Sequence, residues 1–210
     1  MINIKANTLS EAWRKSLVAL AKTPKTDDPE LEKNDILIAE ISSPLSGERF
    51  DKDFPMSQEL MEEYNDYIVK GGEKGSVLYE HALYHERIFC FPPNRNQIDV
   101  VVAKLKSNPF SKRAQISLWD PNNDPENKKV PCIQIIWFRI ENQKLVMHVH
   151  MRACDAYKKF LMNINICASL MAYVAQLLNI EPGLYVHFVD SFHIYKEDFE
   201  KAAKLENEQA

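Results

Sequence analysis

The residues best suited to chemistry lie in the second half of the chain. They are a thiol, a fixed cation, a carboxylate, a carboxamide and a His-x-Tyr pair: Cys132, Arg152, Asp155, Asn163, His193 and Tyr195. A thiolate can add to an electron-poor ring, while cations bind phosphate and carboxamides bind the edges of bases. The set therefore suits an enzyme that holds a nucleotide and attacks its base.

Cys132 has two interpretations. A free cysteine at the start of an apolar strand is most often a core residue. A nucleophilic cysteine instead needs a nearby cation that favours the thiolate. The apolar segments 132–140 and 144–152, separated by Glu141-Asn142-Gln143, predict a β-hairpin that would bring Arg152 alongside Cys132.

Asp155 and Asn163 also have structural alternatives. Asp155 could be the N-cap of a helix or an acid in its first turn, where the helix dipole favours it. Asn163 falls inside a largely apolar segment, where an amide is costly unless its hydrogen bonds are satisfied. Because an amide carries a donor and an acceptor, Asn163 could read a uracil edge or bond a backbone carbonyl.

Two further pairs complete the candidate set. His193 and Tyr195 share one face of a predicted strand, because they are two residues apart. They suit a sugar hydroxyl or a half-exposed edge strand. Lys112 and Arg113 lie at a predicted helix-to-strand junction, where they could bind phosphate or be solvated.

The composition limits the classes of protein to which the chain can belong. The chain has 210 residues and a net charge of −4, which predicts a single domain over 1–210 with a full core and no specific nucleic-acid partner. No apolar run is expected to reach the roughly 20 residues that cross a membrane. Four unpaired cysteines and the lack of a signal-peptide pattern indicate a cytoplasmic protein. Glycine-rich phosphate loops are absent from the sequence.

The coarse pattern predicts an α/β fold. We expect helices over 9–22 (capped by Ser10), 56–70, 96–107, 155–178 and 196–206. We expect strands over 35–42, 113–119, 132–140, 144–152 and 184–195, with a turn at 181–183. The segment 75–87 is ambiguous. A mixed sheet of about five or six strands should pack one face on the helix 155–178.

The order of these motifs resembles the thymidylate synthase family, and most closely its compact archaeal branch. The resemblance covers about half of the chain. It rests on Tyr84-His85-Glu86-Arg87, Asn96-Gln97-Ile98-Asp99, Asn108-Pro109-Phe110-Ser111-Lys112-Arg113, Ser117-Leu118-Trp119-Asp120-Pro121, Pro131-Cys132, Arg152-Ala153-Cys154-Asp155, Asn163 and His193-Ile194-Tyr195. It implies a thymidylate synthase-like mixed β-sheet with packed helices, in a homodimer joined sheet to sheet.

The resemblance implies a methyltransferase that forms dTMP from dUMP. Cys132 would add to the pyrimidine, and Arg152 would bind the phosphate and favour the thiolate. Lys112 and Arg113 would reach the phosphate of a partner subunit. Asp155 would orient the base.

The remaining roles follow from the same resemblance. Asn163 would select uracil, and His193 and Tyr195 would bind the ribose. Tyr84 would help to remove the proton from carbon 5, and Glu59 would be the catalytic glutamate. The co-substrate would be 5,10-methylene-tetrahydrofolate or methylene-tetrahydromethanopterin, without a metal.

The chain departs from the family pattern at several places. Ala153 replaces the motif serine, and Ile133 replaces a histidine that often follows the nucleophile. Arg49 is the one weak match to an N-terminal arginine loop. A tryptophan-bearing insertion and a hydrophobic C-terminal lid are missing. Water could then attack the methylene intermediate, which leaves a dUMP or dCMP hydroxymethylase as the alternative.

Two other classes remain open. Histidines in Glu80-His81, His85-Glu86 and His148-x-His150 have spacings that could hold zinc, although the complete H-E-x-x-H pattern is absent. An inactive nucleotide- or RNA-binding homologue is also compatible with the fold.

Overall fold

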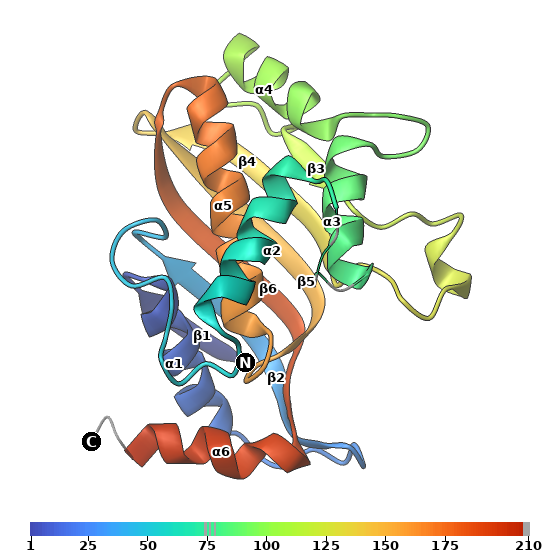
Figure 1. The fold of residues 1–210 in the computed structure, drawn as a ribbon. Helices are drawn as coiled ribbons and strands as arrows, with labels where there is room; N and C mark the ends of the chain where they lie inside the picture. Colours follow the sequence, from blue (N-terminus) through green and yellow to red (C-terminus); the bar gives the residue numbers. More distant parts are fainter. Residues whose placement is uncertain (74, 76, 78, 208–210) are drawn as a thin grey trace.

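A six-stranded mixed sheet organises the molecule. The computed structural model describes residues 1–73, 75, 77 and 79–207. The strands are β1 (Ile2–Ala6), β2 (Leu31–Ile41), β3 (Gln115–Ser117), β4 (Ile133–Glu141), β5 (Lys144–Asp155) and β6 (Glu181–Tyr195), in the order β1-β2-β6-β5-β4-β3 (Figure 1). The β1–β2 and β5–β6 pairs are parallel, and the other pairs are antiparallel.

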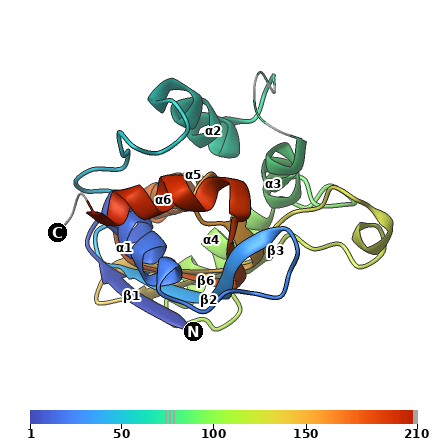
Figure 2. The same cartoon turned by 90° about the horizontal axis from the view of Figure 1, so that it is seen from below.

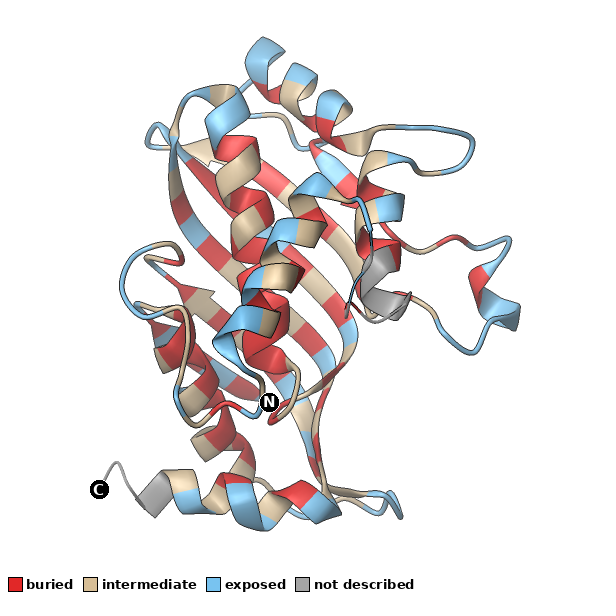
Figure 3. Cartoon of the chain, in the orientation of Figure 1, coloured by how far each residue is buried: buried red, intermediate tan, exposed pale blue. Residues whose placement is uncertain are grey.

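The helices build layers on one face of this sheet. They are α1 (Leu9–Ala21), α2 (Gln58–Lys70), α3 (Tyr79–Phe89), α4 (Gln97–Ser107), α5 (Phe160–Leu178) and α6 (Lys196–Asn207), with a 3₁₀ turn, η1 (Asp124–Glu126). Figure 2 shows α5 and α1 above the sheet, α6 crossing near them and α2 further out. The buried side chains of α5 and of the inward faces of β4, β5 and β6 belong to one hydrophobic core, and Figure 3 marks the buried positions along these elements in red.

Helix α5 is the apolar centre of the fold. It contains no charged residue, so its length and composition alone would allow it to cross a bilayer, which corrects the expectation that no segment approaches that length. However, 67% of its most apolar window is buried inside the molecule. It therefore has the character of a core helix.

Most of the predicted elements form, and their ends have local causes. The hydroxyls of Thr8 and Ser57 cap α1 and α2 by accepting backbone N–H groups, and the Asn96 side chain caps α4. The predicted cap Ser10 is wrong, because its hydroxyl donates to Asp51 instead. The ambiguous segment forms α3 from Tyr79 onward.

Several predicted boundaries were wrong. The prediction had no strand at β1, and β2 begins four residues earlier than expected. The expected turn at 181–183 belongs to β6, where Pro182 pairs with Leu145. Asp155 ends β5, and α5 begins only at Phe160, so Asp155 is not in the first turn of the helix.

The other face of the sheet is not covered by any described element. Figure 2 shows the helices on the opposite side. Half-buried or exposed side chains from three adjacent strands line a shallow apolar hollow of about 360 Å³ there: Ile135, Trp137, His148, His150, Val186 and Phe188. A face of this composition is available for a second protein surface.

Candidate active site

The β4–β5 hairpin brings Cys132 and Arg152 together. The Arg152 amide donates a hydrogen bond of 3.0 Å to the Cys132 carbonyl. The Arg152 Nε atom donates to the Pro131 carbonyl at 3.4 Å, so the guanidinium lies beside the segment that carries the thiol. Cys132 is half-buried and Arg152 is exposed, which leaves both accessible from outside. The predicted hairpin is confirmed.

Tyr84 approaches Cys132 from α3. Its side chain is only 1% exposed, and burial raises the pKa of its hydroxyl well above the usual value. Cys132 contributes to the shift in two opposed ways. Its thiolate would raise the pKa, while a hydrogen bond with its backbone lowers it. Tyr84 is therefore a protonated hydroxyl near the candidate nucleophile.

Asn163 enters the same region from α5. It is 3% exposed, and its Nδ2 atom donates to the Cys154 sulfur at 3.5 Å. Its Oδ1 atom is buried and has no hydrogen-bond partner among the described residues. A buried acceptor without a partner is costly, so this oxygen is a ready site for a ligand donor.

Asp155 lies next to the His-x-Tyr pair. Parallel pairing of β5 with β6 sets Asp155 opposite His193. The Asp155 Oδ1 atom accepts the amides of Tyr157 and Lys158, each at 2.9 Å. Burial nonetheless raises the pKa of its carboxyl. The His193 ring lies edge-on to Tyr195 with 5.3 Å between ring centroids, so both polar tips are near this carboxylate.

Lys112 and Arg113 are not part of this cluster within one chain. Both are exposed on the loop between α4 and β3, beside a hollow that also includes the exposed Phe110. The Lys112 carbonyl accepts the indole N–H of Trp137, five residues beyond Cys132 along the strand. At about 3.3 Å per residue, the loop lies roughly 15 Å or more from Cys132.

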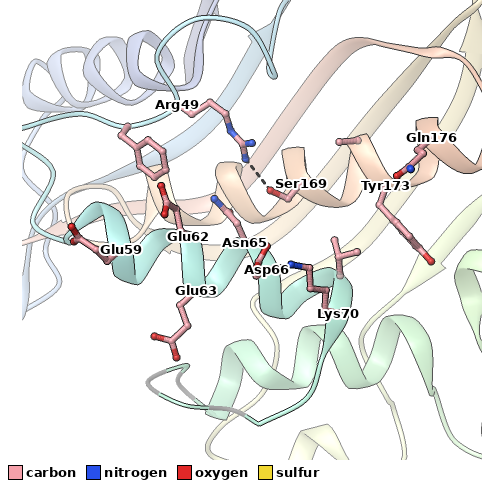
Figure 4. Close-up of a pocket in the computed structure, with 13 residues that line it drawn as sticks. Arg49, Glu59, Glu62, Glu63, Asn65, Asp66, Lys70, Ser169, Tyr173 and Gln176 are labelled. Atoms are coloured by element: carbon pink, nitrogen blue, oxygen red, sulfur yellow. Dashed lines mark hydrogen bonds and ion pairs between the residues drawn. The ribbon is translucent and has the colours of Figure 1, made fainter.

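Arg49 and Glu59 also lie elsewhere. They line a hollow of about 770 Å³ between α2 and α5, which Figure 4 shows in close-up. Arg49 donates to the Asn165 Oδ1 atom at 3.1 Å and to the Ser169 hydroxyl at 2.8 Å, and burial lowers the pKa of its guanidinium. Asn165 and Ser169 follow Asn163 by two and six residues, which places them on a different side of the helix. The structure thus does not bring Arg49 to the Cys132 cluster.

Glu59 is exposed near the start of α2, where hydrogen bonds with its own backbone amide and with the Ser57 side chain lower the pKa of its carboxyl. Figure 4 shows the Glu59 side chain at the N-terminal end of α2, at the opposite end of the hollow from Lys70. The described contacts do not join Glu59 to Cys132, Tyr84 or Asn163.

Two buried polar networks near the site were not predicted from the sequence. In one, the Arg87 guanidinium forms an ion pair with the buried Asp124 carboxylate at 2.7 Å and donates to the Leu118 carbonyl at 2.8 Å. Arg87 follows Tyr84 by one helical turn, so the pair joins α3 to the loop that leads to Cys132. The sequence shows an arginine and an aspartate of opposite charge, but they are 37 residues apart and no spacing rule predicts that they form an ion pair.

In the other network, Tyr185 and His187 are both fully buried on β6. The Tyr185 hydroxyl lies 2.5 Å from the His187 Nδ1 atom, and it also interacts with the Cys167 thiol. Burial lowers the pKa of His187 to about 3 and raises that of Cys167 to about 12. The imidazole and the thiol are therefore neutral near pH 7.

The zinc alternatives gain no support. The described residues contain no group of three or more His, Cys, Asp or Glu side chains placed to hold a metal ion. The side chains of Glu80 and His81 lie outside the described residues. His150 instead lies 2.7 Å from the Asp190 carboxylate on the uncovered face of the sheet.

Comparison with known proteins gives consistent matches. Residues 57–209 match the family model described as thymidylate synthase. A protein of Methanocaldococcus jannaschii named "Putative thymidylate synthase" is 30% identical, over 97% of this chain and 96% of its own length. A protein of the same name from Methanosarcina mazei is 27% identical, over 96% of this chain and 93% of its own. The "Thymidylate synthase" of Mycoplasma pneumoniae is 31% identical over 50% of this chain and 37% of its own.

The Arg87–Asp124 pair generates a stability prediction. Arg87→Met should lower the free energy of unfolding by about 3–5 kcal/mol, because it leaves the Asp124 carboxylate buried without its cation. Urea denaturation followed by circular dichroism measures the change. Lys70→Met is the matched control, since its pair with Asp66 is exposed and should contribute about 0.5 kcal/mol or less. Equal losses in the free energy of unfolding for the two variants would show that the Arg87–Asp124 pair does not stabilise the fold more than an exposed pair.

His187 generates a pH prediction. A histidine in the unfolded chain has a pKa of about 6.5, whereas burial holds the pKa of the folded His187 at about 3. The unfolded chain therefore binds the extra proton between these values, and stability should fall as the pH drops from about 6.5 towards 3. Guanidinium unfolding at several pH values should show a shallower fall for His187→Gln than for the original chain. Parallel curves for the two proteins would refute a neutral buried imidazole.

Proposed function

Because the chain belongs to the thymidylate synthase family, we propose that it methylates dUMP to dTMP with a methylene-tetrahydropterin as co-substrate. One observation carries the proposal. Three separate elements meet beside Cys132: the β4–β5 hairpin with Arg152 and Cys154, α3 with Tyr84, and α5, whose Asn163 bonds Cys154. A core cysteine would not need a cation beside its own segment or, on the neighbouring helix, a buried amide oxygen without a partner among the described residues.

The proposed chemistry uses each group in turn. Cys132 adds to carbon 6 of the uracil ring, and the nearby Arg152 cation favours the thiolate and binds the phosphate. Asn163 accepts the ring N–H with its unpaired oxygen. Tyr84 is placed to assist proton transfer at carbon 5. The pterin supplies the one-carbon unit and the hydride, and it is either a tetrahydrofolate or a tetrahydromethanopterin.

The other groups hold the substrate. Asp155 orients the base from the end of β5, and His193 and Tyr195 bind the ribose hydroxyl. Glu59 stays a prediction for the catalytic glutamate, although a movement of α2 would be needed to bring it to the ring. Free thiols fit work in a reducing cytoplasm.

A hydroxymethylase is the second candidate function. Lys158 binds the Glu197 and Asp198 carboxylates at 2.8 and 2.5 Å, and α6, which also contacts α1, is a charged helix rather than an apolar lid. Water that reached the methylene intermediate would give a hydroxymethyl product. The amide at Asn163, where an acid would suit cytosine, favours a uracil substrate in either case.

A homodimer joined through the uncovered sheet face is the second part of the proposal. That face is apolar at Trp137, Val186 and Phe188, and Trp137 also holds the loop that carries Lys112 and Arg113. A two-fold axis through such a face would extend the loop of one subunit towards the phosphate site of the other. This arrangement gives the two basic residues a function that they lack within one chain.

Cys132→Ser should abolish the release of tritium from carbon 5 of labelled dUMP, because that exchange requires covalent addition at carbon 6. Binding of dUMP, measured by calorimetry, should stay within a few-fold of the original value. Cys90→Ser serves as the control, since this exposed thiol lies on a different loop. Tritium release by the serine variant would remove Cys132 from the role of nucleophile.

Subunit mixing tests the shared phosphate site. Cys132→Ser and Arg113→Ala should each be inactive or strongly impaired as separate proteins. After the two variants are unfolded and refolded together, half of the dimers should carry one intact site, giving roughly a quarter of the original activity. No recovery of activity, with mixed dimers demonstrated by mass spectrometry, would show that Arg113 does not serve the partner.

Phe188→Asp should convert the dimer to monomers, because it places a charge in the centre of the proposed interface. Light scattering after size-exclusion chromatography measures the mass. Leu177→Asp is the control, as Leu177 is 37% exposed on α5, away from that face. A monomeric original chain, or a dimeric Phe188 variant, would contradict the proposed interface.

A further inference from the structure

We infer that Cys154 sets the preference of the site for uracil over cytosine by fixing which end of the Asn163 amide faces the base. The inference rests on the proposed function. It assigns to Cys154 a positioning role that is separate from the nucleophile Cys132.

The hydrogen bonds of the Cys154 sulfur determine the orientation of the amide. Cys154 is 4% exposed, and its Sγ atom donates to the Asp155 carbonyl at 3.6 Å. The single thiol proton is then in use, so the sulfur can offer only lone pairs to Asn163. It accepts the Asn163 Nδ2 group at 3.5 Å. Burial raises the pKa of the thiol well above its usual value, which keeps this pattern unchanged at neutral pH.

The opposite end of the amide is left for the ligand. The Asn163 Oδ1 atom is buried and has no partner among the described residues. The neighbouring Asn165 differs, because its Oδ1 atom accepts the Arg49 Nε group and its Nδ2 atom donates to the carbonyls of Arg49 and Leu161. Of these two amides on α5, only Asn163 has an oxygen that accepts no hydrogen bond from the described residues.

This orientation discriminates between two bases. The ring nitrogen at position 3 is a donor in uracil and an acceptor in cytosine, so an amide oxygen matches uracil and opposes cytosine. An amide that was free to turn by 180° could instead present its NH₂ group to cytosine. Cys154 makes that turn costly, because it would set the amide oxygen against the sulfur.

The test compares the affinities of dUMP and dCMP by calorimetry on the full chain. Cys154→Ala removes the acceptor and should lower the dUMP-to-dCMP preference by roughly three- to tenfold, the range expected for one hydrogen bond. Cys154→Ser should keep the preference within about twofold, because a hydroxyl can donate to Asp155 and accept from Asn163. Cys167→Ala is the matched control, since this buried thiol does not bond Asn163 and should leave the preference unchanged.

The ratio of the two affinities distinguishes positioning from general damage, which would weaken both nucleotides together. If the alanine variant fails to fold, Cys154→Val keeps most of the side-chain volume without a comparable acceptor and should show the same loss of preference. An unchanged ratio in the alanine or valine variant would overturn the role of Cys154. Absence of dUMP binding by the original chain would instead overturn the proposed function.

Discussion

The antiparallel pairing of β4 with β5 is the constraint on which the rest of the candidate site depends. The paired strands, a register shift between Ile133 and Ile135, and the hydrogen bond from the Arg152 amide to the Cys132 carbonyl together set the cation beside the segment that carries the thiol. The same strand then carries Cys154 and Asp155 to its end, where β6 pairs in parallel and brings His193 opposite Asp155. A shift of β5 by one residue would turn the Arg152, Cys154 and Asp155 side chains to the faces opposite to those they now occupy.

The apolar helix α5 imposes the second constraint. Its packing in the core would make any isolated polar group expensive, yet Asn163 and Asn165 both occur there. Asn165 is satisfied by Arg49 and the helix backbone, and it helps to fasten the loop before α2. Asn163 is satisfied at one end only. Of these two amides, only Asn163 has a buried oxygen with no hydrogen-bond partner among the described residues.

Local sequence patterns predicted the hairpin closely, and they predicted the C-terminal ends of α5 and β6 but not their first residues, because the apolar patterns of these elements are long but their starts are not marked. They missed β1, which has only five residues, and they misread Glu181-Pro182-Gly183 as a turn. Gly183 is needed there for close approach, since a Cβ atom would lie 2.9 Å from the Lys144 Cβ atom. Tertiary packing therefore overrides the usual turn preference of Pro-Gly.

The candidate site was predictable only in part. Motif order identified the family and suggested Cys132, Arg152, Asp155 and Asn163, which the fold gathers around one region. The Arg87–Asp124 pair and the contact of Cys154 with Asn163 join residues that are distant in sequence or obey no spacing rule. Such contacts depend on the assembled fold, as does the separation of Arg49 from the cluster.

The most direct test of the central claim is the identity of the nucleotide product. The purified chain would be incubated with dUMP and each methylene-tetrahydropterin, and the nucleotides would be analysed by mass spectrometry. We expect dTMP from the original chain and none from the Cys132→Ser variant. A hydroxymethyl product, or dTMP formation that persists without the Cys132 thiol, would show that the proposed function is wrong.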